Sequence, residues 1–150
     1  MNSEAFYRAL FQFHFDQNLK ILDTIKKHFQ VLEHTGHALF CHSINAHQVW
    51  NARILNQPTE EVFKIHALDT CQDRMEKNQD ETELILEKFD LNESIVYLNS
   101  RYERFDNSIN DILYHILNHY AHHRGQIVMD MRNNGIEPPI TDFIFYKREL

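Results

Sequence analysis

Glycine and proline are scarce in this sequence, with three of each among 150 residues. Antiparallel sandwiches and barrels need turn residues roughly every 8–12 positions, so this scarcity excludes an all-β fold. The glycines Gly36, Gly125 and Gly135 stand far apart, which also excludes a glycine-rich phosphate-binding loop. We therefore expect a mostly helical chain with few breaks.

Cysteine and positive charge are also in short supply. Cys41 and Cys71 are too few for a disulfide framework, which favours a reducing, cytoplasmic setting. The formal net charge of −7 lacks the basic balance of a nucleic-acid-binding protein. The sequence has no basic and apolar leader and no run of about 18 apolar residues, so we expect neither a signal peptide nor a membrane span. Small molecules are the expected ligands.

Apolar residues recur every three or four positions over four long segments, which predicts four helices within a single domain spanning residues 1–150. Capping residues and prolines set their ends. The expected helices run from about Ser3 to Glu33, from Ala38 to Leu55, from Leu68 to Phe89, and from an N-cap at Asn107 or Ser108 to Gly135.

The fold class that these segments predict is all-α, a four-helix up-down bundle with alternating helix directions. A short C-terminal segment from Thr141 is expected to dock on the bundle. The linker before the fourth helix contains Ile95-Val-Tyr-Leu98, which favours either a short strand or a segment lying over the bundle. The first helix has more phenylalanines than one apolar stripe needs, which favours a homodimer with part of that helix in the interface.

Histidine is abundant, with 11 residues, and the informative ones lie in the fourth helix. Each helical residue advances by about 100°, so His115, His119 and His123 share one face. Adjacent members of this series have the i,i+4 spacing that places two imidazoles on one metal ion. Gln126 lies within about 20° of His119 and faces the same way, whereas His122 lies to one side.

A third ligand is expected from a facing helix, and the second helix offers His42 and His47. His42 lies in the middle of the apolar stripe that includes Ala46 and Val49. His47 lies about 140° away from it, so only one of the two can share the inward face. The pattern therefore favours His42 as the third ligand.

Three inward histidines need partners once they are buried, and a shared divalent cation satisfies all of them at once. Imidazole nitrogens suit Zn, Ni, Cu or Fe. Two other interpretations stay open from the residues alone. Such histidines can be hydrogen-bonded core residues, or they can line an empty, solvated cavity.

Two stretches carry a resemblance to a known family, the DinB/YfiT-like proteins. The fourth helix resembles the C-terminal signature of that family, and the second helix resembles its other signature, at a spacing of eight residues between histidine and tryptophan. The matching motifs are His115-x3-His119-x3-His123-Arg-Gly-Gln126, then Gly135-Ile-Glu-Pro-Pro139, and His42-x7-Trp50-x2-Arg53.

This resemblance implies a four-helix bundle that holds a divalent metal on His42, His119 and His123, usually as a dimer. It also implies thiol-dependent transferase or isomerase chemistry with bacillithiol or mycothiol, although many members have no assigned reaction. This sequence departs from the pattern at His47, where an acidic residue is common, which leaves open a supporting role for His47.

Three neutral histidines leave a metal with open positions, as in catalytic sites. Such a metal could equally generate a hydroxide nucleophile or bind and deprotonate a thiol. The resemblance favours the thiol, and so implies a metal-dependent transferase, with Zn or Ni most favoured, that moves a low-molecular-weight thiol onto a small electrophile. Gln126 is expected to orient water or substrate, and His115 to act as a proton acceptor or support. A hydrolase is less favoured because Asp111 is too far along the helix to serve as a base. The alternative is a non-catalytic dimeric bundle that a metal stabilises or that senses a metal.

Overall fold

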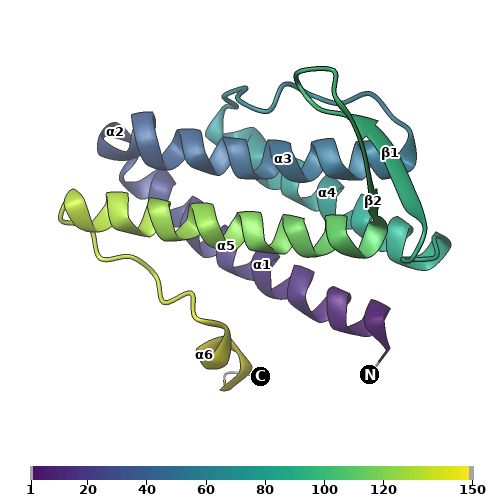
Figure 1. Cartoon of the computed structure of the whole chain (residues 1–150). Helices are drawn as coiled ribbons and strands as arrows, with labels where there is room; N and C mark the ends of the chain where they lie inside the picture. Colours follow the sequence, from purple (N-terminus) through teal and green to yellow (C-terminus); the bar gives the residue numbers. More distant parts are fainter. Residues whose placement is uncertain (1, 149–150) are drawn as a thin grey trace.

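The structure is a computed structural model that describes residues 2–148, and this part of the chain is mostly helical with one two-stranded sheet. Four long helices lie side by side (Figure 1): α1 (Ser3–Lys27), α3 (Ala38–Leu55), α4 (Leu68–Lys88) and α5 (Ile109–Asn133). The shorter elements are α2 (Phe29–Leu32), the π-helix η1 (Glu33–His37), β1 (Ser94–Leu98), β2 (Arg104–Ser108) and α6 (Phe143–Arg148). Among the helices described, none is long and apolar enough to cross a membrane.

The helix ends follow local chemistry that the sequence predicts. Ser108 is the N-cap of α5, and its side chain and that of Asp111 form a reciprocal capping box. Gly135 takes a left-handed conformation with φ of +70° after α5. Helix α3 ends at Leu55, and Asn56 follows it with φ of 54°.

The first helix is shorter than predicted, and the expected break at residues 34–36 is displaced. α1 ends at Lys27, and His28 interrupts it before α2 begins. The chain then continues without a loop through the π-helix η1 into α3. Gly36 lies in η1, where its backbone N–H donates to Asp130 Oδ2 at 3.0 Å. A Cβ there would lie 3.2 Å from the same oxygen, so this close approach favours glycine.

The predicted alternation of helix directions is wrong for α3 and α4, which run parallel. Near their N-terminal ends Cys41 lies beside Cys71, and further along both helices His47 contacts Thr82. The connecting linker, residues 56–67, therefore returns along the bundle (Figure 1). It can extend to roughly 40 Å, more than the length of about 27 Å for an 18-residue helix. Helical periodicity fixes the spans of helices but not the path of such a linker.

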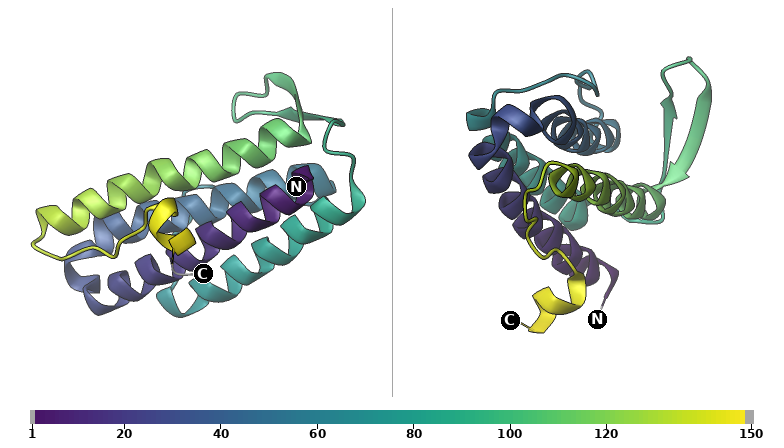
Figure 2. Two further views of the ribbon diagram at one scale, coloured as in Figure 1. Left: turned by 90° about the horizontal axis from the view of Figure 1, so that it is seen from below. Right: turned by 90° about the vertical axis from the view of Figure 1, so that its left-hand side faces the viewer.

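A β-hairpin lies between α4 and α5 and stands beside one end of the helices (Figure 2). Residues Ile95–Leu98 form a strand, one of the two predicted alternatives, as part of β1. This strand pairs antiparallel with β2 from Ser94↔Ser108 to Leu98↔Arg104. The sequence did not predict β2, because Arg-Phe-Asp-Asn-Ser shows no alternation of apolar and polar residues.

The phenylalanines of α1 are covered largely by the chain itself. Phe13 is 5 % exposed and packs edge-on against the rings of Phe143 and Tyr146 at centroid distances of 5.0 and 5.2 Å. The Tyr146 hydroxyl donates to Asp16 Oδ2 at 2.7 Å. The C-terminal segment therefore docks on α1 as predicted and covers Phe13, while Phe6 of the same helix stays 50 % exposed.

Candidate metal centre

His42, His119 and His123 come together between α3 and α5, although 77 residues of sequence separate the first two. One ring nitrogen from each lies within 4.8 Å of the others. The Nε2 atoms of His119 and His123 are 3.0 Å apart, and the His42 ring lies 5.0 and 4.8 Å from their ring centroids. The one-turn spacing on α5 aligns the two histidines, and α3 presents His42 to them.

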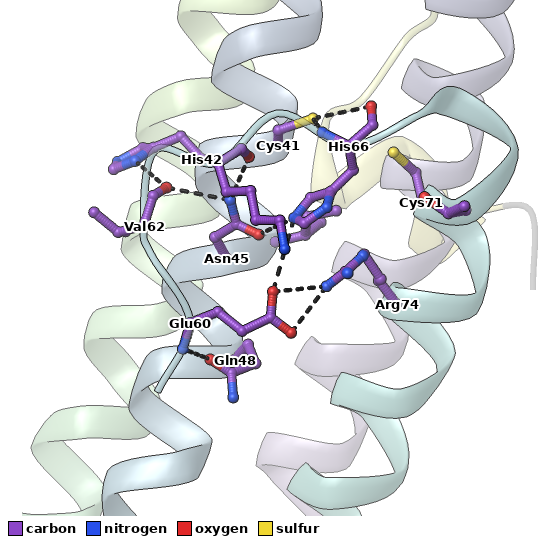
Figure 3. A network of polar contacts seen from close by, with 12 residues as sticks. Cys41, His42, Asn45, Gln48, Glu60, Val62, His66, Cys71 and Arg74 are labelled. Atoms are coloured by element: carbon purple, nitrogen blue, oxygen red, sulfur yellow. Dashed lines mark hydrogen bonds and ion pairs between the residues drawn. The ribbon is translucent and has the colours of Figure 1, made fainter. Parts of the chain in front are cut away.

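Two of these rings are held by hydrogen bonds on the nitrogen that faces away from the cluster. His123 Nδ1 donates to Gln126 Oε1 at 2.6 Å. His42 Nδ1 donates to the carbonyl of Val62 in the linker at 3.3 Å (Figure 3). Each bond fixes the tautomer and leaves Nε2 with a free lone pair.

The donor set fits a small divalent cation. With metal–nitrogen bonds of about 2.0–2.1 Å, tetrahedral ligand nitrogens lie about 3.3–3.4 Å apart, so small rotations of these half-buried rings suffice. Burial, followed by the neighbouring His123 and His42, lowers the pKa of His119 to about 3. Burial and His123 also lower the pKa of His42. The neutral imidazole is the form that ligates a metal.

Gln126 and His115, the two predicted catalytic residues, lie in different places. The Gln126 side-chain oxygen accepts the hydrogen bond from His123 Nδ1, so it contacts a predicted ligand. His115 is one turn before His119, with ring centroids 5.7 Å apart, and packs edge-on against Trp50 at 5.2 Å. Burial lowers the pKa of the His115 imidazole.

His115 lines a pocket of about 240 Å³ beside the three histidines. Its aromatic walls are Trp50 and Tyr97, and the Arg53 guanidinium lies over both rings at 4.4 and 4.6 Å from their centroids. The carboxylate of Asp111 also borders this pocket, but it accepts the Ser108 N–H at 3.2 Å as part of the capping box.

His47 lies apart from this centre, inside the helical core. Its Nδ1 is 2.9 Å from the Tyr120 hydroxyl, its Nε2 is 2.7 Å from Thr82 Oγ1, and its ring stacks on Phe11. His122 is exposed and lies outside the group of three ligands, although its ring is 4.8 Å from that of His123. The placement of His122 agrees with its helical-wheel position. The prediction for α3 needs correction, because its buried face carries His47, whereas His42 and its expected stripe neighbour Val49 are only half-buried.

Sequence reasoning missed the contribution of the linker to this centre. Phe63 is 71 % exposed and stacks on the His42 ring at 4.9 Å with an interplanar angle of 12°. Its neighbour Val62 supplies the carbonyl that holds His42. The signal in the sequence for this contact is a phenylalanine within a polar linker. The helical periodicity of apolar residues does not indicate which helix such a linker crosses.

Buried neutral histidines make the metal-free protein sensitive to acid. The pKa values of His14 and His47 are lowered to about 3, mainly by burial, and at His14 also by Arg124, which donates to Nδ1 at 3.0 Å. Between pH 6.5 and 3 both histidines are protonated in the unfolded chain but stay neutral in the folded chain. The stabilisation is thus complete above pH 6.5 and is lost as the pH falls towards 3.

We expect the free energy of unfolding to fall by about 1.4 kcal/mol per pH unit for each such histidine. Urea denaturation of metal-free protein from neutral pH to about pH 4.5 measures this loss. His47→Gln should reduce the slope of unfolding free energy against pH by the contribution of one histidine. A urea midpoint that does not change with pH would contradict the lowered pKa values of these histidines.

Comparison with known proteins supplies the family. No curated protein and no solved structure gives a significant match to this chain. The sequence profile of the DinB family matches residues 33–149, which include α3, α5 and all three histidines of the centre. With most of its length covered by that profile, the chain belongs to the DinB family.

Proposed function

We propose that this protein is a metal-dependent enzyme that transfers a low-molecular-weight thiol onto a small electrophile. His42, His119 and His123 would hold one divalent transition metal ion, for which we propose Zn or Ni among the ions that suit imidazole donors. The observation that carries the proposal is the convergence of three neutral rings, two of them fixed at Nδ1. DinB family membership supports it.

A bound ion with three neutral ligands keeps its full charge and so lowers the pKa of a coordinated thiol or water. Other side chains of the protein would bind the substrate. The pocket walled by Trp50 and Tyr97 binds the apolar part of the electrophile, and Arg53 keeps those two rings in place. Its 240 Å³ suits a small molecule.

His115 would take the proton of the thiol, since it lines the pocket and its ring lies 5.7 Å from that of His119. In the proposed step the thiol sulfur attacks an electrophilic carbon of the substrate, and a carbon–sulfur bond forms. The leaving group departs with its bonding electron pair, and the thiol proton passes to His115.

A non-catalytic role is the second candidate, a bundle that a metal stabilises or that senses a metal. Two observations favour it. Phe63 lies flat against His42, and no carboxylate of the described residues belongs to the three-histidine group. This role predicts loss of stability on chelation without turnover. A homodimer stays a prediction for either role, and sedimentation of the untagged protein measures it.

Turnover after metal removal and reloading separates the two functions. Untagged protein is stripped with a chelator, reloaded with Zn or Ni, and assayed for consumption of bacillithiol, mycothiol, cysteine or glutathione with a fluorogenic alkylating electrophile. We expect turnover only after reloading, and an unchanged rate in His122→Ala. If reloaded protein regains stability but consumes no thiol above the uncatalysed rate, the non-catalytic role is correct.

Gln126→Ala should weaken metal binding about 10–100-fold, the effect typical of losing a group that orients a ligand. The reason is that His123 Nδ1 loses its acceptor at 2.6 Å and the ring is free to change tautomer and rotate. Competition with a chromophoric chelator measures the change. Gln126→Glu keeps an acceptor and should restore affinity, whereas unchanged affinity in the alanine variant would contradict this role.

A further inference from the structure

A second group of metal-binding side chains lies on the other side of α3 from His42 (Figure 3). The thiols of Cys41 on α3 and Cys71 on α4 and a ring nitrogen of His37 in η1 lie within 4.8 Å of one another. Cys41 and Cys71 are 0 % exposed and His37 is 3 % exposed. Both cysteines are free thiols.

His37 is the side chain that lacks an explanation within the fold. Neither of its ring nitrogens has a hydrogen-bond partner among the described residues, although both are buried. Buried polar atoms are nearly always paired, and an orphaned imidazole points to an absent ligand. His37 ends a π-helix, an element that often marks functional positions because it displaces side chains from the regular helical register.

The surroundings of Cys41 suit a thiolate ligand, whereas the Cys71 thiol donates to the carbonyl of Ala67 at 3.5 Å and would give up this contact on binding a metal. The backbone N–H of His66 points at Cys41 Sγ at 3.4 Å, as expected of a group that supports a negatively charged sulfur. The His66 ring is committed elsewhere, with Nε2 2.6 Å from Asn45 Oδ1. The cluster therefore offers two sulfurs and one imidazole, with a fourth position left open.

We propose that His37, Cys41 and Cys71 form a second, sulfur-containing site that binds a zinc ion. Two thiolates balance the charge of Zn²⁺, so the loaded site is neutral and suited to a buried position. With zinc–sulfur bonds of about 2.3 Å and zinc–nitrogen bonds of about 2.0 Å, ligand atoms lie about 3.3–3.8 Å apart, within reach of side-chain rotation. The ion would join η1, α3 and α4 at one end of the molecule.

A surface depression gives the ion a route to this site. It has a volume of about 390 Å³ and reaches His37 between the π-helix and the end of the linker. The residues that line it are Phe29, Glu33, His34, His37, Ala38, Ile65, His66 and Ala67. The three-histidine group lacks sulfur, so the two sites differ in the ligands they offer and can be told apart by spectroscopy.

Cobalt substitution and metal counting test the proposal together. Untagged protein loaded with Co²⁺ should bind two ions per chain and show the near-ultraviolet charge-transfer band of cobalt–thiolate bonds. Cys71→Ser should bind one ion and lose the band. His119→Ala should also lose one ion but keep the band. This pair separates failure of the second site from failure of the proposed function, which rests on the first.

Stability gives a second readout that requires no activity. Zinc at about a hundred times its Kd should raise the Tm of His119→Ala by roughly 5–10 °C, and this rise should vanish when Cys71→Ser is added. His34→Ala, an exposed neighbour of His37, is the matched control and should behave like the parent. Retention of the first ion by Cys71→Ser shows that this variant is folded, and His37→Asn repeats the test if it is not.

Three outcomes would overturn the proposal. The first is a cobalt-loaded protein without a thiolate band. The second is a band that survives in the folded Cys71→Ser variant. The third is a Cys41–Cys71 disulfide, detected in untreated protein by mass spectrometry as the loss of two hydrogens, that persists when metal is added under reducing conditions.

Discussion

Replacing His119 by alanine is expected to weaken metal binding at the three-histidine group about 10²–10³-fold. This figure follows from dividing the roughly 10–16 kcal/mol with which a protein zinc site binds its ion among four ligands, at about 1.4 kcal/mol for each tenfold change. His119 adjoins both other ligands, with its ring 5.0 Å from that of His42 and its Nε2 3.0 Å from that of His123. Thiol transfer should fall to the uncatalysed rate at the metal concentrations that saturate the parent protein.

His122→Ala is the matched control, because it removes an exposed imidazole from the same helix without touching the three-ligand group. Isothermal titration with Zn²⁺ of protein in which Cys71 is also replaced measures the three-histidine group alone. Equal affinities of the His119 and His122 variants would show that the three rings do not hold the ion.

His47→Ala should lower the free energy of unfolding by about 3–5 kcal/mol. The change opens a cavity beneath Phe11 and leaves the Tyr120 hydroxyl, 2.9 Å from the ring, without its partner. Thr82 Oγ1 also loses its contact at 2.7 Å but keeps Asn51 as a partner. His47 is 3 % exposed, so water cannot readily replace the imidazole. Urea denaturation measures the loss.

The same variant distinguishes a core residue from a ligand. Below its unfolding transition, His47→Ala should bind as much metal as the parent protein. Tyr120→Phe should cost about 1 kcal/mol alone and less in the absence of His47, because the two groups share one hydrogen bond. Metal loss in the folded His47 variant would instead place this histidine in the site.

The features that sequence reasoning predicted are those that local chemistry determines. Apolar spacing along α4 and α5 and the capping residue Ser108 act within a few turns, so the helix spans were predictable. The convergence of His119 and His123 follows from their one-turn spacing. The choice of His42 over His47 rested on an expected apolar stripe, but the buried face of α3 carries His47, and His42 is half-buried where α3 meets α5.

The features that were missed depend on contacts between distant segments. The parallel course of α3 and α4 depends on how residues 56–67 cross the bundle, and no helical period specifies that path. The grouping of Cys41 and Cys71 depends on this parallel arrangement, which brings the N-terminal ends of both helices together. A π-helix in place of a loop then adds His37, and helical-wheel reasoning assumes a regular period that a π-helix breaks.

The linker over α3 contacts His42 in two ways, which differ in how strongly they depend on the linker sequence. Its Val62 carbonyl orients His42 through the main chain, so almost any residue at that position preserves the contact. Its Phe63 side chain, in contrast, is 71 % exposed and covers the His42 ring on the outside of the centre. Substitution of Phe63 can therefore change access to the histidines, whereas His66 and Glu60 of the same linker contact Asn45 of α3 and Arg74 of α4 and hold it to the helices.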